Sequence, residues 1–436
     1  MTRAYILHPD LKRLDPRARP PERALEEAVG LAAAIDLSVE GAEVVPLPKP
    51  NPGSLFGSGK VEELAGRLKA KDVEVVVIDG PVTPVQQRNL EKEWKVKLLD
   101  RTGLILEIFG ERAGTREGVL QVELAALEYA RTRLVRSWTH LERQRGGLGF
   151  VGGPGETQIE ADRRAISDRI KQIERRLEKV VRTRGLHRAA REKVPYPIVA
   201  LVGYTNAGKS TLFNSLTAAG VMAEDMLFAT LDPTMREVRL PSGRRAILSD
   251  TVGFVSDLPT QLVAAFRATL EEVLAADVIV HVRDVSHPDA DAQRDDVLTV
   301  LADLGVDEPR RDGIIEARNK IDLVVGEDRL ALLNETARAE GALPVSALTG
   351  EGVVGLLAAI EARLAARAQQ RRLHVPHEDG AALAWLHARL QVLAVETDDA
   401  GALATVEGDP EDFARFRRRF PAVRDVSDAP QARAAQ

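Results

Sequence analysis

The stretch Ile198-Val-Ala-Leu-Val-Gly-Tyr-Thr-Asn-Ala-Gly-Lys-Ser-Thr211 decides the fold of the chain. Its first six residues are apolar, which predicts a buried strand. The pattern Gly-x-x-x-x-Gly-Lys-Ser runs from Gly203 to Ser210, and a helical pattern begins at Thr211. A strand, a glycine-rich turn and a helix start in this order are the context in which the pattern is a phosphate-binding loop rather than a chance turn.

The residue types in this loop suit a nucleotide phosphate. Gly203 and Gly208 let the backbone curl, so that successive N–H groups point at the β-phosphate at a helix N-terminus. The ammonium group of Lys209 would reach the β- and γ-phosphates, and the hydroxyl of Ser210 would bind Mg²⁺. The sequence therefore predicts a nucleotide site with Mg²⁺ as its cofactor.

Composition limits the kinds of protein that the chain can be. Its 436 residues suffice for roughly three domains, and 44% hydrophobic with 29% charged residues is typical of globular proteins. The absence of cysteine excludes disulfides, thiolate zinc sites and cysteine nucleophiles. No signal-peptide pattern and no apolar run of ~20 residues occurs, so we expect a cytoplasmic protein without membrane insertion.

Alternating strand and helix patterns predict a multidomain α/β chain. Ahead of the phosphate loop, strands are expected at 5–9, 42–47 and 73–78, and helices at 24–37, 61–69 and 84–94. After the loop, a strand hairpin is expected around 241–244, and further strands at 277–285, 313–319 and 342–345. The expected divisions are an N-terminal α/β domain at 1–112, a basic helical hairpin at 113–194, a doubly wound P-loop domain at 197–367 and a small α+β domain at 368–436. The last should hold a helix, two strands and a second helix, and its tail at 429–436 is expected to be disordered.

The predicted helical hairpin depends on apolar residues at helical spacing. The first helix carries one apolar face, formed by Val119, Val122, Ala126, Leu127, Ala130 and Leu134. The second carries a heptad seam, formed by Ile166, Ile170, Ile173, Leu177 and Val180. This spacing predicts an antiparallel coiled pair. The segment 146–157, with six glycines in its first ten residues, would be a loop at the tip of the pair.

The hairpin also concentrates positive charge. Residues 131–193 contain 17 Lys and Arg against 8 Asp and Glu, a local charge of +9 in a chain of net charge −6. A solvated arginine-rich helix pair is one explanation, and a phosphate-rich partner is the other. Candidate RNA contacts are Arg143, Arg145, Arg163, Arg164, Arg175 and Arg176.

Gly57-Ser58-Gly59-Lys60 resembles a second phosphate loop, but its spacing fails. Gly53 lies one residue too far from Gly59-Lys60, and Val61 stands where a magnesium-binding hydroxyl would be. We therefore expect a structural role or a weak nucleotide contact here rather than a second catalytic site.

Two further segments can complete the phosphate and metal site. Asp250-Thr-Val-Gly253 is expected at the end of a strand, where the Asp250 carboxylate can order a water on Mg²⁺ and the Gly253 N–H can meet the γ-phosphate. Thr230 is the candidate switch threonine, whose hydroxyl would complete the metal shell when the γ-phosphate is present. An ordinary turn residue is the alternative for Thr230.

Asn319-Lys-Ile-Asp322 indicates which base the site binds. An ionised Asp322 can accept hydrogen bonds from both N1–H and the 2-amino group of guanine, whereas adenine has no donor at either position. Asn319 would brace the loops and contact the base, and Lys320 would lie along the ring. Ser346-Ala-Leu348 follows a strand, and the Ala347 N–H can meet the guanine carbonyl. The sequence thus predicts a GTP site and a doubly wound P-loop GTPase domain.

The candidate site residues follow from these motifs. Those assigned to the nucleotide are Gly203, Tyr204, Thr205, Asn206, Ala207, Gly208, Lys209, Ser210, Thr211, Phe228, Ala229, Thr230, Leu231, Asp232, Asp250, Thr251, Val252, Gly253, Asn319, Lys320, Ile321, Asp322, Ser346, Ala347 and Leu348. Ser210 and Thr230 are the metal ligands, with Asp250 acting through water, and the catalytic groups are Lys209, Thr230 and Gly253.

One position departs from many small GTPases, in which a glutamine after Asp-x-x-Gly orients the attacking water. Here Phe254 occupies it, and a phenyl ring can neither hydrogen-bond nor transfer a proton. The isolated protein is therefore expected to hydrolyse GTP slowly, with a partner or another residue ordering the water. His281 and His287 are possible helpers, although a lone histidine after a strand is more often structural.

Together these motifs resemble the HflX family of translational GTPases. The resemblance rests on Gly203–Thr211, on Phe228-Ala-Thr-Leu-Asp232, on Asp250-Thr-Val-Gly-Phe254 and on Asn319–Asp322. Outside the nucleotide domain it rests on Asp100-Arg-Thr-Gly-Leu-Ile-Leu106, Leu120-Gln-Val-Glu-Leu124 and Gly152-Gly-Pro-Gly-Glu-Thr-Gln158. It covers about residues 40–350.

The resemblance implies binding to the large (50S) ribosomal subunit and its rRNA through the N-terminal domain and the hairpin. It also implies dissociation or rescue of stalled ribosomes, hydrolysis stimulated by the ribosome, and some use of ATP beside GTP. The alternative is a large-subunit assembly or regulatory factor in which GTP only controls binding. A third class, a GTPase acting on a protein or membrane partner, would not need the hairpin charge. We expect a monomer that does not bind DNA.

Overall fold

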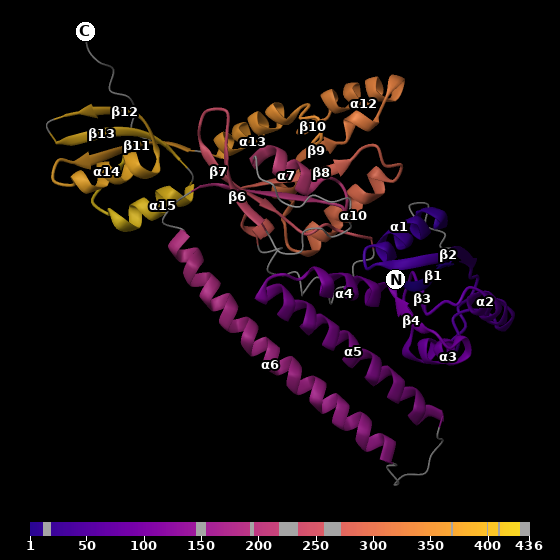
Figure 1. Cartoon of the computed structure of the whole chain (residues 1–436). Coiled ribbons are helices and arrows are strands. Elements are labelled where there is room, and N and C mark those ends of the chain that lie inside the picture. The colour runs from indigo at the N-terminus through magenta and orange to yellow at the C-terminus, as the bar shows by residue number, and fades with distance from the viewer. Residues whose placement is uncertain are drawn as a thin grey trace.

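The computed structural model describes residues 1–11, 19–144, 154–191, 196–217, 234–256, 272–367, 369–398, 400–408 and 410–427. These residues form three lobes, each built on its own β-sheet, together with two long helices (Figure 1). The fold is a multidomain α/β arrangement, as the sequence predicted. Within the described ranges, every helix is too short or too polar to cross a membrane.

The N-terminal lobe is a parallel sheet covered by helices, as expected from its alternating pattern. Its strands are β1 (Thr2–Asp10), β2 (Leu37–Pro46), β3 (Val75–Ile78) and β4 (Lys97–Asp100), in the order β2-β1-β3-β4. Its helices are α1 (Pro21–Ala33), α2 (Ser58–Ala70), α3 (Pro84–Trp94) and α4 (Arg101–Arg112). All three strand pairs are parallel. The all-apolar strand β3 lies in the interior of the sheet and is buried on both faces.

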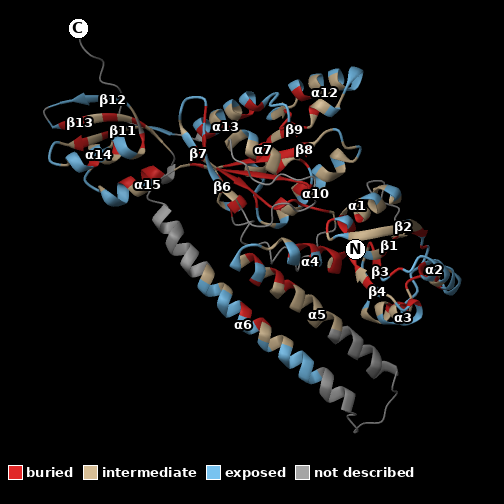
Figure 2. Cartoon of the chain, viewed as in Figure 1, coloured by how far each residue is buried: buried red, intermediate tan, exposed pale blue. Residues whose placement is uncertain are grey.

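Helices α5 (Arg116–Gln144) and α6 (Pro154–Arg191) lie side by side below the lobes (Figure 1). Ile170 and Ile173 of the heptad seam are buried, whereas most of the described surface of α6 is exposed (Figure 2). The predicted face of the first helix is partly wrong, because Val119 is 47% exposed while Leu120 and Ala125 are buried. The reason is that α5 packs against α4 and α3 as well as α6, so its buried surface is not a single stripe.

The last four residues of the expected glycine-rich loop at 146–157 are helical instead. Helix α6 already begins at Pro154, a residue type that suits the first turn of a helix because its missing N–H would have no helical partner. Gly146 to Gly153 lie outside the described residues.

The central lobe is a six-stranded doubly wound sheet. Its strands are β5 (Ile198–Gly203), β6 (Thr234–Arg239), β7 (Arg245–Asp250), β8 (Val278–Asp284), β9 (Ile315–Asn319) and β10 (Ala342–Pro344), in the order β10-β9-β8-β5-β7-β6. The expected hairpin is present as the antiparallel pair β6–β7, and the other pairs are parallel. The described helices are α7 (Lys209–Thr217), α10 (Ala290–Asp303), α11 (Glu308–Asp312), α12 (Gly326–Arg338) and α13 (Val353–Arg367), with a 3₁₀ turn at Ile321–Leu323.

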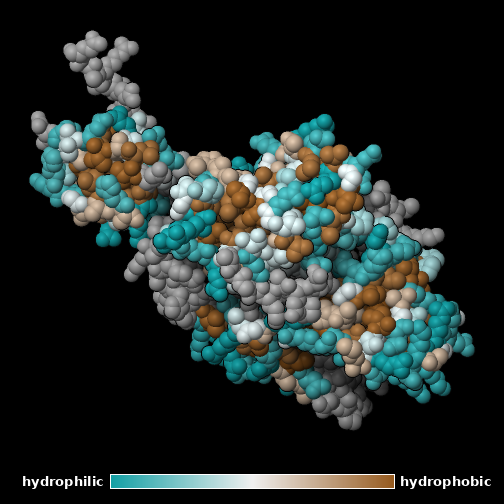
Figure 3. Space-filling model, turned by 45° about the horizontal axis from the view of Figure 1, so that its top comes forward, coloured by the Kyte–Doolittle hydropathy of each residue, from teal (hydrophilic) through white to brown (hydrophobic). Residues whose placement is uncertain are grey.

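The C-terminal lobe corrects one prediction, because it begins with a strand rather than a helix. Its order is β11 (Gln369–Pro376), α14 (Gly380–Arg389), β12 (Gln391–Thr397), β13 (Gly401–Gly408), α15 (Pro410–Arg419) and β14 (Arg424–Asp425). Strand β11 is mostly polar, and only Leu373 and Val375 alternate into the core, which is too short a pattern to identify a strand. Figure 3 shows hydrophobic residues gathered on this lobe, and Leu393 and Val395 of edge strand β12 are partly exposed.

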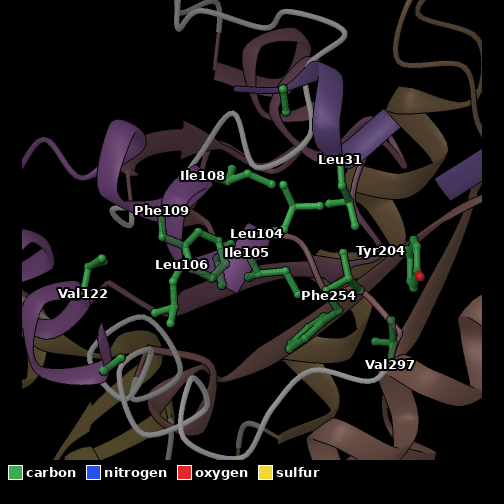
Figure 4. Close-up of a cluster of buried hydrophobic side chains, with 14 of the residues drawn as sticks. Leu31, Leu104, Ile105, Leu106, Ile108, Phe109, Val122, Tyr204, Phe254 and Val297 are labelled. Atoms are coloured by element: carbon green, nitrogen blue, oxygen red, sulfur yellow. The ribbon is translucent and has the colours of Figure 1, made fainter. Parts of the chain in front are cut away.

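The N-terminal and central lobes share a hydrophobic core. Leu104, Ile105 and Ile108 of α4 belong to the same buried cluster as Phe254 and Tyr204 (Figure 4). Burying apolar surface contributes roughly 25 cal/mol per Å², so a shared core holds the two lobes together. This contact places the nucleotide motifs of the central sheet directly against the N-terminal lobe.

Candidate nucleotide site

The phosphate loop joins β5 to α7, and its two glycines are required by close contacts. A Cβ on Gly203 would lie 2.2 Å from the carbonyl oxygen of Val282 in the neighbouring strand β8. A Cβ on Gly208 would lie 2.3 Å from Nδ2 of Asn319, and Gly208 has a φ of 88°. Both positions exclude every side chain, so the glycines predicted from the motif are explained by packing as well as by conformation.

Lys209 is buried at the first turn of α7. Its Nζ donates a hydrogen bond to the carbonyl oxygen of Tyr204 at 2.8 Å. Burial lowers the pKa of Lys209 to about 8, although the carboxylate of Asp250 acts in the opposite direction. An ammonium group in such a position has lost much of its hydration, which strengthens its attraction to a phosphate.

Two of the residues assigned to the metal, Ser210 and Asp250, lie in contact. The Ser210 hydroxyl donates to Oδ2 of Asp250 at 2.7 Å, and Asp250 is fully buried at the end of β7. A hydroxyl and a carboxylate are oxygen donors of the kind that Mg²⁺ prefers, so these residues fit that ion. Thr230 lies outside the described residues, together with Phe228, Ala229, Leu231 and Asp232.

Gly253 lies against the phosphate loop. A Cβ at this position would come within 2.8 Å of Thr205 Cγ2 and 3.1 Å of Lys209 Nζ. The backbone on either side is held to the same loop, because Phe254 N donates to Gly203 O at 3.1 Å and Thr205 N donates to Phe254 O at 2.8 Å. The Asp-x-x-Gly segment and the phosphate loop therefore form one unit.

Phe254, at the position of the missing glutamine, is buried in a hydrophobic cluster that also includes Tyr204. Its side chain is 2% exposed and packs in the core shared with the N-terminal lobe (Figure 4). The sequence showed that this residue cannot orient water; the structure adds that the position serves packing between lobes.

The base-binding motifs meet at the other end of the loop. Asn319 Nδ2 donates to Ala207 O at 2.8 Å, and Asn319 Oδ1 accepts from Ala347 N at 2.9 Å. Asn319 thus braces the two loops, as expected. The Ala347 N–H, which the sequence assigned to the guanine carbonyl, has Asn319 as its acceptor instead.

The remaining residues of these motifs lie beside Asn319. Lys320 has a φ of 66°, and its Nζ lies 2.8 Å from Asp284 Oδ2 at the end of β8. The half-buried Asp322 follows in the 3₁₀ turn. Ser346 is buried and accepts from Thr349 N, whereas Leu348 is largely exposed.

Other candidates have structural roles. Burial lowers the pKa of His281 to about 3, so its ring is neutral, and His287 Nδ1 accepts from Asp289 N in a local turn. Lys60, from the second glycine motif, pairs with Glu43 and Glu63 near the start of α2.

The arginines proposed for RNA are exposed where their side chains are described. Arg163, Arg164, Arg175 and Arg176 lie on the outer surface of α6. The side chain of Arg143 and the whole of Arg145 lie outside the described residues. One set of contacts has no signal in the sequence. Arg19 and Glu27 of the N-terminal lobe contact Tyr204 in the phosphate loop, and Arg101 contacts Ser256, which follows the Asp-x-x-Gly segment.

Known protein families match this chain along most of its length. Four family models match, described as GTP-binding GTPase N-terminal (22–110), GTP-binding GTPase Middle Region (112–191), 50S ribosome-binding GTPase (198–320) and HflX C-terminal domain (331–422). The chain is 52% identical to GTPase HflX of Magnetococcus marinus over 91% of this chain and 90% of that one. It is 43% identical to GTPase HflX of Escherichia coli over 86% of this chain and 87% of that one. A GTP-binding protein from Sulfolobus solfataricus, solved with GDP, is 23% identical over 83% of this chain and 98% of that one, with a TM-score of 0.44.

Proposed function

The chain belongs to the HflX family of GTPases, and from that premise we propose that it is a GTP-dependent switch acting on the large (50S) ribosomal subunit. In this proposal it dissociates or rescues stalled ribosomes. The observation that carries it is the pair α5–α6, which projects from the GTPase and presents the exposed arginines of α6. The family model that matches residues 198–320 is described as a 50S ribosome-binding GTPase, which supports the same partner.

We propose that the hairpin binds ribosomal RNA through its phosphates. The major groove of A-form RNA is deep and narrow, so arginine side chains on a helix cannot contact base edges there. They can contact backbone phosphates, which are the same at every sequence. In this proposal residues 1–194 bind the subunit and residues 197–367 hydrolyse GTP. No role is assigned to residues 368–436. Binding should weaken steeply with salt, because each phosphate contact releases a counterion.

For the GTPase site we propose the following roles. Lys209 stabilises charge that develops on the γ-phosphate, and the Gly253 N–H donates to the same group. Ser210, with Asp250 behind it and Thr230 from the switch segment, would hold Mg²⁺. When bound, that ion would neutralise charge on the β- and γ-phosphates. Asp322 selects guanine, and water is the nucleophile.

The alternative is an assembly or regulatory factor, in which GTP only controls affinity. The deciding experiment mixes intact ribosomes with the full chain and a non-hydrolysable GTP analogue, and follows subunits by sedimentation. We expect subunit separation with the analogue, because GTP binding would set the working conformation, and reuse of the protein only with GTP. Binding to immature large subunits without separation of intact ribosomes would favour the alternative.

A further inference from the structure

A polar network joins the N-terminal lobe to the phosphate loop. The side chain of Tyr204 leaves the loop toward that lobe, where its hydroxyl donates to Glu27 Oε2 at 2.8 Å and accepts from Arg19 Nη1 at 2.9 Å. It also accepts from the backbone N–H of Ser256 at 2.7 Å. The backbone carbonyl oxygen of Tyr204 accepts a hydrogen bond from Lys209 Nζ. Tyr204 therefore connects the lysine of the phosphate loop to the N-terminal lobe.

Arg101 supplies the second connection. It is the first residue of α4, it is buried, and it donates to the carbonyl oxygen and the hydroxyl of Ser256 at 3.0 and 2.9 Å. The same guanidinium contacts Asp79 at 2.6 Å and also Glu27. Burial alone would lower the pKa of Arg101, but these two carboxylates raise it above its ordinary value, so the group is charged.

Two arginines in this network pair with three carboxylates. Arg19 and Arg101 face Glu27 and Asp79, and Arg19 extends to Asp296 of α10 at 2.7 Å. Buried ions are costly unless they are paired and hydrogen-bonded, and here each ion has several partners. Such a network fixes the groups that it contacts to one geometry.

Ser256 is three residues beyond Gly253, and the backbone between them is held at both ends. Gly253 and Phe254 lie on the phosphate loop, Phe254 and Val255 are buried, and Ser256 is held by Tyr204 and Arg101. The segment that carries the proposed γ-phosphate N–H is therefore fixed partly by side chains from another lobe.

We propose that Arg101 and Tyr204 are positioning residues for GTP hydrolysis. They hold Ser256, and through it they keep the Gly253 N–H in place against the phosphate loop. Hydrogen-bond donors accelerate a reaction when they are already aimed at developing charge, and small displacements are costly. This inference rests on the proposed site roles of Lys209 and Gly253, but not on the ribosomal partner.

The neighbouring residue provides a contrast. Asp100 faces the hairpin, where it accepts hydrogen bonds from Tyr129 and Arg133 of α5 and caps α4 through Gly103 N. Tyr129 is thus a partly buried tyrosine of the hairpin that is hydrogen-bonded to a carboxylate of the N-terminal lobe rather than to Ser256. Tyr129→Phe is the matched control for Tyr204→Phe.

The test measures steady-state GTP hydrolysis by the full chain without ribosomes. Arg101→Lys keeps the charge but loses the planar fork that reaches three groups at once, and Tyr204→Phe keeps the ring in the shared core. We expect each to lower kcat about tenfold with KM for GTP changed less than about twofold. The double variant should lose little more than either single one, because both act on the same segment. Tyr129→Phe should retain kcat within about twofold.

Measuring kcat and KM separately distinguishes two roles. A positioning role lowers kcat, whereas a role limited to holding the two lobes together leaves kcat unchanged in the folded variant. Thermal unfolding of each variant sets an assay temperature at which all are folded. A kcat that is unchanged or raised at that temperature would overturn the inference, because it would mean that the network only joins the lobes or restrains the switch. Lys209→Ala, measured in parallel, tests the site itself: full hydrolysis by that variant would refute the site roles instead.

Discussion

Asp322→Asn is expected to lower GTP affinity by about 10³-fold, because it removes the charge that we propose pairs with two guanine donors. The change keeps the side-chain shape. The new amide N–H would face the 2-amino group of guanine, donor against donor, whereas xanthine has a carbonyl there. We therefore expect the variant to bind xanthosine triphosphate more tightly than GTP. Equilibrium titration with fluorescent analogues of both nucleotides measures the switch.

The matched control for this change is Asp328→Asn, which alters an exposed carboxylate six residues further along, in the first turn of α12. It should leave both affinities within about twofold, since exposed charges far from the ligand are screened. Unchanged base preference in Asp322→Asn would show that another group selects guanine. The bracing contacts of Asn319 would then be the next place to look.

Reversing the charge of Arg163, Arg164, Arg175 and Arg176 to glutamate should weaken binding to the large ribosomal subunit by about 10²–10³-fold. Each substitution would remove a proposed phosphate contact and add a repulsive charge. All four side chains are exposed on α6, so the fold and the basal GTPase rate should be preserved. Co-sedimentation with purified subunits at fixed salt measures the loss.

A control variant of equal charge uses Arg239, Arg338, Arg418 and Arg424, which are exposed outside the hairpin. If binding depends on the hairpin, this variant should bind several-fold less tightly at most. Equal losses in both variants would mean that net charge, and not the hairpin, determines binding. No loss in the hairpin variant would remove α6 from the interface.

Sequence reasoning predicted the nucleotide motifs because their chemistry is local. Gly203, Gly208 and Lys209 are placed by a strand, a turn and a helix start that adjoin in the chain. The meeting of Ser210 with Asp250 also followed, because the carboxyl ends of neighbouring parallel strands share one edge of a sheet.

The features that were not predicted depend on distant partners. Nothing near Tyr204 or Phe254 in the sequence shows that both side chains face α1 and α4. The acceptor of the Ala347 N–H is a side chain 28 residues away. Val119 is exposed because α5 packs against several helices, and the mostly polar β11 is a strand because it pairs with β13 on one side and with β14 on the other. Tertiary packing decided these positions, as it often does over local pattern.

We propose that this protein is a slow GTPase whose hydrolysis is stimulated by the ribosome. GTP hydrolysis by the full chain is followed with and without purified large ribosomal subunits, at two salt concentrations. We predict strong stimulation that fades at the higher salt, because the proposed subunit binding would depend on phosphate contacts. An unchanged rate at both concentrations would contradict the ribosomal role while leaving the GTP site in place.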